Sequence, residues 1–204
     1  MKIFAVADIH GAQYRVNEIR NVIEKHNPDI ICVCGDITQF GPGEVATLLL
    51  DQLPGKVIVV PGNIDTSDVI DGIKKSHADN VQQNRFEFKG VSFLGLNGVS
   101  DNETFSFYSN PVNRAVFKHI DVLMTHVPPY GFQDNIFLGK HGGSKILYEI
   151  MQEIKPRLVL CGHIHENPGY AKTKDTVIVN CSMGKRGKGA IVHLEEDISV
   201  EMIN

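Results

Sequence analysis

Five short motifs in this 204-residue chain carry side chains that bind metal ions and transfer protons. Each motif follows an apolar run, and each supplies Asp, Asn or His. Residues two apart in an extended segment point to the same side, so an Asp-x-His or a His-x-His can aim two ligands at one point. The motifs are Asp8-Ile9-His10, Gly35-Asp36, Gly62-Asn63, His126 and Gly162-His163-Ile164-His165.

Together these motifs offer four imidazoles, two carboxylates and one amide oxygen. That set is too large for one tetrahedral zinc ion, whereas its mixed nitrogen and oxygen ligands suit two metal ions. Two metals about 3.5–4 Å apart need a bridging ligand, and a carboxylate can give one oxygen to each. The sequence therefore predicts a dinuclear metal site.

Taken singly, each motif also has an ordinary structural explanation. Asp36 could cap a helix, Asn63 could lie in a turn, and the histidine pair could be satisfied within a turn. The glycines before Asp36, Asn63 and His163 let the chain turn, or let another backbone approach closely. The placement of all five motifs at successive strand ends favours the metal site over these explanations.

The first sixty residues alternate between strand and helix patterns. We predict strands at 2–7, 29–34 and 56–60, joined by helices at 12–26 and 42–53. Such a βαβαβ order implies parallel strands covered by helices. Ligands of open α/β sheets bind at the carboxyl ends of the strands, which is where the predicted metal ligands lie.

The remainder of the chain is less regular, and no repeat or linker divides it, so we predict one domain, 1–204. Asp65, Thr66 and Ser67 offer N-caps for a short helix that ends near Lys75. The other predicted elements are a hairpin of 85–88 and 91–94, a polar surface loop at 100–112, a short helix at 113–118, strands at 121–125 and 158–161, a long loop at 127–143, a helix at 144–154 and about three strands in 176–204.

The order of the five motifs resembles the signature blocks of the calcineurin-like metallophosphoesterases, over residues 8 to 165. The resemblance implies an α/β fold, a four-layer α/β/β/α sandwich of two packed mixed sheets flanked by helices. It also implies two divalent metal ions, which we expect to be Mn, Fe, Zn or Ni. By the resemblance, one metal takes Asp8, His10 and His165, the other takes Asn63, His126 and His163, and Asp36 bridges them.

The chain departs from the family pattern at Ile64, where the family has a histidine that is thought to protonate the leaving group or hold the phosphate. An aliphatic side chain can do neither, although the retained Asn63 should preserve metal binding. General acid catalysis typically contributes about 10²–10⁴ in rate. We therefore expect a hydrolase for small phosphate esters whose leaving groups depart easily, with phosphodiesters favoured. The alternative is a metal-binding regulatory or scaffolding module without turnover.

A glycine-rich segment ahead of the predicted helix at 144–154 is a second candidate region. A helix N-terminus with flanking glycines offers N–H groups to a phosphate, so Gly142, Gly143 and Ser144 are candidate substrate contacts. Asn63, one of the predicted metal ligands, is a further candidate substrate contact. His141 is a candidate proton donor or phosphate contact. The alternative for Ser144 is an ordinary helix cap.

Composition argues against several other classes of protein. The net charge of −4 is unfavourable for general nucleic-acid binding, and no apolar run approaches the roughly 20 residues that cross a bilayer. No Gly-x-Gly-x-x-Gly follows the first strand, which argues against a dinucleotide-binding domain. We interpret Lys185, Arg186 and Lys188, which lie among glycines, as a solvated hairpin turn in preference to a phosphate-binding patch.

The cysteines indicate the compartment. They lie in or beside apolar runs without a C-x-x-C, which is typical of small buried residues kept reduced in the cytoplasm. We expect a cytoplasmic protein, and the oligomeric state stays open, with a dimer among the alternatives. The cysteines are Cys32, Cys34, Cys161 and Cys181.

Overall fold

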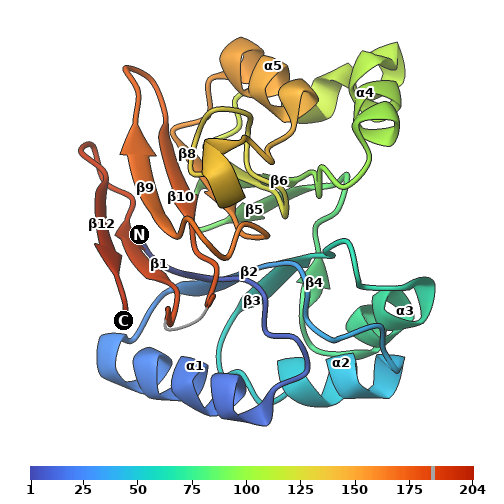
Figure 1. Cartoon of the computed structure of the whole chain (residues 1–204), viewed down its shortest axis with the longest axis vertical. Coiled ribbons are helices and arrows are strands. Elements are labelled where there is room, and N and C mark those ends of the chain that lie inside the picture. The colour runs from blue at the N-terminus through green and yellow to red at the C-terminus, as the bar shows by residue number, and fades with distance from the viewer. Residues whose placement is uncertain (185–186) are drawn as a thin grey trace.

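The computed structural model describes residues 1–184 and 187–204, and in it two six-stranded sheets pack face to face (Figure 1). Lys185 and Arg186, predicted to lie in a hairpin turn, are outside the described residues. The first sheet has the strand order β12 (Ser199–Met202), β11 (Ala190–His193), β1 (Lys2–Val6), β2 (Ile30–Cys34), β3 (Val57–Val60), β4 (Asp79–Asn80). The second has the order β5 (Arg85–Phe88), β6 (Val91–Gly95), β7 (Val122–Met124), β8 (Leu158–Cys161), β10 (Val177–Asn180), β9 (Gly169–Lys172).

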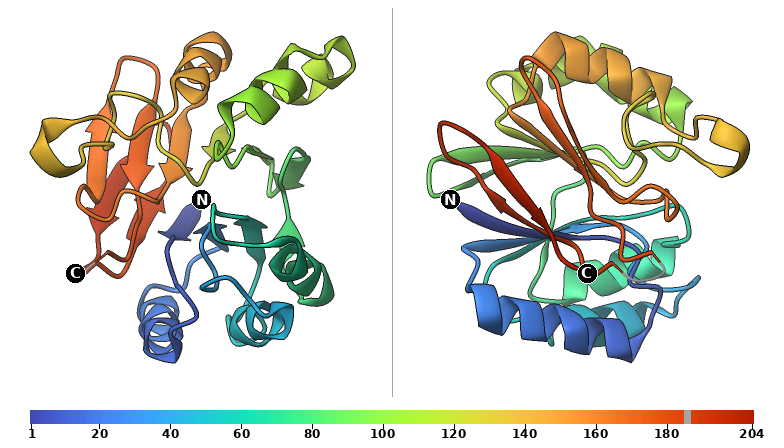
Figure 2. Two further views of the ribbon diagram at one scale, coloured as in Figure 1. Left: turned by 45° about the vertical axis from the view of Figure 1, so that its right-hand side comes forward. Right: turned by 60° about the vertical axis from the view of Figure 1, so that its left-hand side comes forward.

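Helices cover the outer face of each sheet, so the predicted α/β/β/α sandwich is confirmed (Figure 2). Three α-helices cover the first sheet: α1 (Gln13–His26), α2 (Gly43–Leu50) and α3 (Ser67–Lys75). The second is covered by α4 (Asp101–Ser109), the 3-10 helix η1 (Pro111–Phe117) and α5 (Lys145–Ile154). Another 3-10 turn, η2 (Phe137–Gly139), interrupts the long loop at 127–143.

The parallel arrangement predicted for the first three strands is confirmed. β1 pairs with β2 and β2 with β3, all parallel, with Val6 opposite Val33 and Val33 opposite Val59. In the second sheet β6, β7, β8 and β10 are likewise parallel neighbours. The carboxyl ends of these parallel strands therefore meet along one edge of each sheet.

The central strands are buried on both faces, and alternate side chains divide between two cores. In β1, Ile3 and Ala5 face the opposite sheet, whereas Phe4 and Val6 pack under the helices. All four are fully buried. Each core is close-packed, so a register slip of one residue, which exchanges the two faces, would put side chains of different size, such as Phe4 and Ala5, into each other's places and is disfavoured. The ends of the strands are thereby held in fixed register.

Two helices that follow metal-ligand motifs pack at a glycine contact. A Cβ on Gly72 of α3 would lie 2.0 Å from the carbonyl oxygen of Gly43 on α2, so only glycine permits this approach. The Gly43 N–H donates to the Asp68 carboxylate (2.6 Å), and the Thr47 hydroxyl donates to the Gly72 carbonyl (2.8 Å). This contact fixes the loops after β2 and β3 relative to each other.

The structure corrects the expectation of a surface loop at 100–112, because residues 101–109 form α4. The Ser100 hydroxyl accepts from the Glu103 N–H at 3.3 Å, the pattern of an N-capping motif. Tyr108 is buried against Phe117, with ring centroids 4.8 Å apart. Polar composition therefore concealed a helix that is fixed by its N-cap and by tertiary contacts, which include those of Phe107 and Tyr108 with Phe117.

Strand β9 has no counterpart among the predicted elements, and the three strands expected in 176–204 are β10, β11 and β12. The short helix expected at 113–118 is present as η1. Among the described residues, no helix combines the length and the hydropathy needed to cross a membrane.

Candidate metal centre

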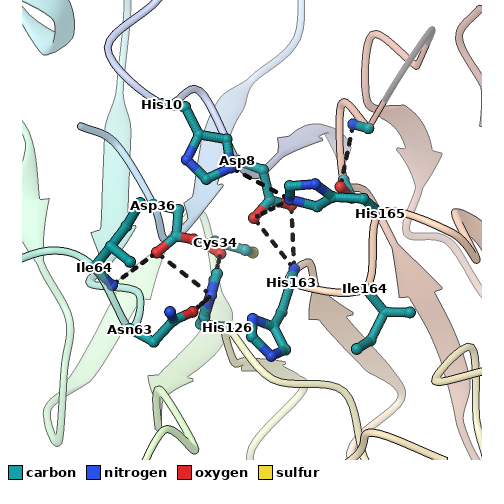
Figure 3. Close-up of polar contacts among 12 residues, drawn as sticks. Asp8, His10, Cys34, Asp36, Asn63, Ile64, His126, His163, Ile164 and His165 are labelled. Carbon is teal, nitrogen blue, oxygen red and sulfur yellow. Dashed lines mark hydrogen bonds and ion pairs between the residues drawn. The ribbon is translucent and has the colours of Figure 1, made fainter. Parts of the chain in front are cut away.

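All seven predicted ligands come together at the carboxyl ends of five strands (Figure 3). These strands belong to both sheets: β1, β2 and β3 to the first, and β7 and β8 to the second. The packing of one sheet on the other is therefore what closes the cluster. The residues are Asp8 and His10 after β1, Asp36 after β2, Asn63 after β3, His126 after β7, and His163 and His165 after β8.

One group consists of Asp8, His10 and His165. His165 Nε2 lies 3.3 Å from Asp8 Oδ1 and 3.3 Å from His10 Nε2. A ligand atom from each of the three residues lies within 4.8 Å of the others. The Asp8 side chain is fully buried, and both imidazoles are half-buried. Two nitrogens and an oxygen thus converge at a site that solvent can reach.

The second group surrounds His126, which is fully buried. Its Nε2 lies 2.8 Å from Asn63 Oδ1 and 3.5 Å from Asp36 Oδ1, and its ring centroid is 4.9 Å from that of His163. Ligand atoms of Asp8, Asp36 and His126 also lie within 4.8 Å of one another. The two groups are therefore adjacent, with both carboxylates between them.

The hydrogen bonds of His126 test whether a cation fits here. Its Nδ1 lies 2.9 Å from the Cys34 carbonyl, and since a carbonyl only accepts, Nδ1 carries the proton. A histidine that binds a metal must have its ligating nitrogen unprotonated, and Nε2 is then the atom whose lone pair faces the oxygens of Asn63 and Asp36. Three electron-rich atoms converge, and a bound cation satisfies them all. The residues present fit a metal pair.

Four of the ligands have left-handed backbone conformations, which are uncommon outside glycine. The φ angles are 65° at Asp8, 53° at His10, 52° at Asp36 and 66° at His163. The Asp8 N–H donates to Gly35 O (3.0 Å) and the His10 N–H donates to Asp36 O (2.9 Å). The backbone pairing of β1 with β2 therefore continues into the segments that follow these strands. This pairing holds the ligands in a conformation that costs free energy locally.

The glycines of the motifs permit close approach, as the sequence indicated. A Cβ on Gly62 would lie 2.1 Å from Asp36 Oδ1, and one on Gly35 would lie 2.4 Å from His126 Nδ1. A Cβ on Gly162 would lie 2.3 Å from the Cβ of Ala7. Each glycine therefore makes room for a ligand or for the residue next to one.

Asp65 has a role that the sequence analysis missed. Its type and position suggested a cap for the next helix, but the N-cap residue of α3 is Thr66. The buried Asp65 carboxylate instead accepts from the N–H groups of Ile37 (3.1 Å), Thr38 (3.2 Å) and Gly62 (2.9 Å). It joins the loop that carries Asp36 to the loop that carries Asn63. The position of Asp65, two residues after the predicted ligand Asn63, was the sequence feature that could have indicated this role.

Ile64 contributes to the site through its backbone. Its N–H donates to Asp36 Oδ1 at 3.2 Å, and its half-buried side chain lies at the edge of the cluster (Figure 3). Any residue except proline can supply that N–H group. The backbone around Asp36 therefore tolerates the exchange of histidine for isoleucine.

Burial and mutual contact set the charges of these groups. Burial raises the pKa of Asp36 to about 6 against the opposing effects of His126 and the Ile64 N–H. Burial would also raise the pKa of Asp8, but hydrogen bonds from His165 and Ser182 and the nearby His126 together lower it. Burial, reinforced by His126, lowers the pKa of His163 to about 4. At neutral pH the protein thus presents two carboxylates and a neutral His163.

The glycine-rich loop has a different arrangement from the expected phosphate cradle. The Gly142 N–H donates to Asp134 O (2.9 Å), the Gly143 N–H to Asp134 Oδ2 (3.1 Å) and the Ser144 N–H to Pro128 O (2.9 Å). The Ser144 hydroxyl accepts from the Leu147 N–H at 3.1 Å. These bonds occupy the N–H groups that would hold an anion, so the structure favours the alternative that Ser144 is a helix cap.

His141 is held by the same loop. Its Nδ1 lies 2.7 Å from Oδ1 of Asp134, whose fully buried carboxylate also accepts from the Gly131 N–H (2.9 Å). The imidazole is 38% exposed and packs beside Tyr130, with ring centroids 5.0 Å apart. The loop also packs close to Ile164, which stands between the ligands His163 and His165. A Cβ on Gly142 would lie only 3.0 Å from Cδ1 of Ile164.

The raised pKa of Asp36 generates a prediction for the metal-free protein. The folded chain keeps the Asp36 proton up to about pH 6, whereas the unfolded chain loses it near 3.8, so this group's contribution to stability falls as the pH rises through that interval. Asp36→Asn should therefore raise the free energy of unfolding near pH 7.5 by on the order of 3 kcal/mol. Near pH 4 the two proteins should have similar stability.

Urea unfolding with chelator present measures this difference at both pH values. His163 titrates in both proteins and so does not enter the comparison to first order. With metal present the sign should reverse, because the substitution removes a carboxylate ligand. A destabilised, metal-free Asp36→Asn protein near pH 7.5 would contradict the electrostatic account.

Comparisons with known proteins agree with this geometry. The profile of the calcineurin-like phosphoesterase family matches residues 1–167. An uncharacterized protein of Methanocaldococcus jannaschii is 33% identical over 199 residues, covering 89% of this chain and 88% of its own. Human metallophosphoesterase domain-containing protein 1 is 36% identical, covering 76% of this chain and 60% of its own length.

Solved structures share the fold at low sequence identity. A protein of Thermus thermophilus has a TM-score of 0.75 at 12% identity, covering 100% of this chain and 99% of its own. A dimetal phosphatase from Danio rerio has a TM-score of 0.67 at 13% identity, covering 99% and 95%. The family profile matches most of this chain, and the five motifs lie together at one edge of the two packed sheets. The chain therefore belongs to the calcineurin-like phosphoesterase family.

Proposed function

We propose that the protein hydrolyses phosphate esters, with phosphodiesters favoured, at two divalent metal ions. The observation that supports this most strongly is that five ligand residues from both sheets form two groups that share Asp8, with Asn63 and His163 beside His126. Such a pair supplies an activated water for attack at neutral pH and positive charge for the phosphate oxygens. We expect Mn, Fe, Zn or Ni.

The assignment of ligands follows the two groups of side chains. Asp8, His10 and His165 hold one ion, and their ligand atoms already lie within 4.8 Å of one another. Asn63, His126 and His163 hold the other. Asp36, which has a ligand atom within 4.8 Å of those of Asp8 and His126, would be shared by the two ions. The Asn63 amide lies on the open side of the site, where it can also contact substrate.

The substrate preference follows from Ile64. Without an imidazole at this position, a basic leaving group receives no proton from the usual family residue. Esters whose leaving groups depart as anions are affected least, which favours phosphodiesters and activated esters. A protein of this fold described as a novel archaeal phosphodiesterase has a TM-score of 0.56 at 14% identity.

His141 is our candidate for a proton donor or phosphate contact in place of the missing histidine. Asp134 holds its Nδ1, which leaves Nε2 available to a ligand, as in other base-and-carboxylate pairs. We also propose that the protein acts in the cytoplasm, which the four buried, free cysteines support.

Removal and return of metal tests the proposed function. Chelator-treated protein should lose activity on a generic activated phosphodiester, and Mn²⁺ should restore it at about two ions per chain. A panel of monoesters, diesters and nucleotides with Mn, Ni, Zn and Fe then defines the preference. Full activity without metal would refute the mechanism. Two bound metals without turnover on any ester would favour a regulatory or scaffolding module.

A second prediction concerns His141. His141→Ala should lower turnover by roughly 10- to 100-fold and leave metal content unchanged, because its imidazole is not among the proposed ligands. His77→Ala is a matched control, since His77 Nδ1 pairs with Asp51 at 3.0 Å and its side chain is 39% exposed. Wild-type rates for His141→Ala on every ester would return His141 to a structural role.

A third prediction addresses Ile64. Ile64→His should accelerate esters with basic leaving groups most and change those with acidic leaving groups little. The slope of log rate against leaving-group pKa should become shallower in the variant. Metal content must be measured alongside, because the new histidine can act as a ligand. Equal slopes with two metals in both proteins would show that Ile64 does not mark a missing acid.

A further inference from the structure

Asn180 is a fully buried amide at the carboxyl end of β10, a strand that provides none of the proposed metal ligands. A buried amide costs free energy unless its donors and acceptor find partners. The partners of Asn180 are all main-chain groups, and they come from three separate segments. Two of these segments adjoin proposed metal ligands, and the third is the loop that carries His141.

The Nδ2 group of Asn180 lies within hydrogen-bond distance of three carbonyl oxygens, which share its two hydrogens. Ile164 O lies at 2.9 Å, and Gln133 O and Asn167 O both lie at 3.2 Å. Ile164 stands between the ligands His163 and His165, and Asn167 ends the same turn. Gln133 belongs to the loop that carries Asp134 and His141. One amide thus joins the histidine turn to the glycine-rich loop.

The acceptor of Asn180 extends this network to a carboxylate ligand. Its Oδ1 accepts from the Ser182 N–H at 3.0 Å. The Ser182 hydroxyl hydrogen-bonds to Asp8, and the next residue, Met183, donates its N–H to Ala7 O at 3.1 Å. The segment at 180–183 therefore crosses from the second sheet to the first directly beside Asp8.

We propose that Asn180 is a positioning residue of the metal centre, which sets the place of the His163–His165 turn and holds the His141 loop against it. This inference rests on the proposed metal site, although it does not require turnover. Groups that orient metal ligands through hydrogen bonds typically contribute about 10- to 100-fold to metal affinity or activity. Asn180 would affect metal binding indirectly, because it holds the backbone of the turn that carries His163 and His165.

Thr176 provides a matched control at the opposite end of the same strand. It is also buried, and its hydroxyl donates to Pro156 O at 2.7 Å. Thr176→Val removes a buried hydrogen bond to a loop carbonyl without touching any segment beside the metal centre. A general loss of stability should therefore appear in both variants, whereas an effect on the metal site should appear only at Asn180.

The experiment compares Asn180→Ala, Asn180→Asp and Thr176→Val with the wild type. Mn²⁺ titration should show about 10- to 100-fold weaker binding for both Asn180 variants and a change within about twofold for Thr176→Val. In metal-free protein, amide hydrogen exchange should rise in segments 162–168 and 131–143 for the Asn180 variants only. Asn180→Asp should be the more severe change, because its carboxylate faces three carbonyl oxygens.

The outcomes separate this role from the proposed function, since neither measurement uses turnover. Wild-type Mn²⁺ affinity in Asn180→Ala would overturn the positioning role. So would an exchange pattern that matches that of Thr176→Val. A wild-type protein that binds Mn²⁺ and hydrolyses no ester would overturn the proposed function alone.

Discussion

Two buried carboxylates and the lone pair of a buried histidine meet at the centre of this structure, and that juxtaposition constrains everything around it. Ligand atoms of Asp8, Asp36 and His126 lie within 4.8 Å of one another. Because burial penalises charge, the raised pKa of Asp36 records the cost in the absence of a cation. The surrounding fold must offset this penalty on charge, and a cation bound between the carboxylates would offset it further.

The free energy that offsets the penalty of burying charge comes from apolar layers that lie away from the polar site. One core lies between the sheets and one lies under each set of helices. Together they fix the register of the strands, so that each strand ends at a defined point. The left-handed metal ligands and the close contacts of Gly35, Gly62 and Gly162 occur just beyond those ends. Strain and like charges at the site are thus confined to one edge of a well-packed sandwich.

Buried polar side chains outside the ligand set connect the loops that emerge from these strands. Asp65 links the loop of Asp36 to that of Asn63, and the amide of Asn180 links the histidine turn to the loop of His141. Each works by accepting from, or donating to, main-chain groups of two or more segments. A buried side chain with several main-chain partners holds those segments together, because removing it leaves several polar groups unsatisfied at once.

Much of the fold was readable from the sequence because its signals are local. The apolar runs and helical periodicities of the first sixty residues predict β1, α1, β2, α2 and β3 closely, and the parallel order follows from their alternation. The prediction of a loop at 100–112 was wrong because α4 depends on one cap and on the packing of Tyr108 against Phe117. A tertiary contact of this kind leaves little trace in local composition.

The sequence by itself determined which residues have the chemistry of a metal site, since Asp, Asn and His at strand ends are visible in the chain. Only the tertiary structure decided how they meet. The packing of two sheets brings His126 beside Asn63, although they are 63 residues apart. The structure also shows that the N–H groups of Gly142 and Gly143 donate hydrogen bonds to Asp134. It shows as well that the Asn180 amide hydrogen-bonds to two loops. Hydrogen-bond partners distant in sequence depend on how segments pack, and residue type alone does not specify them.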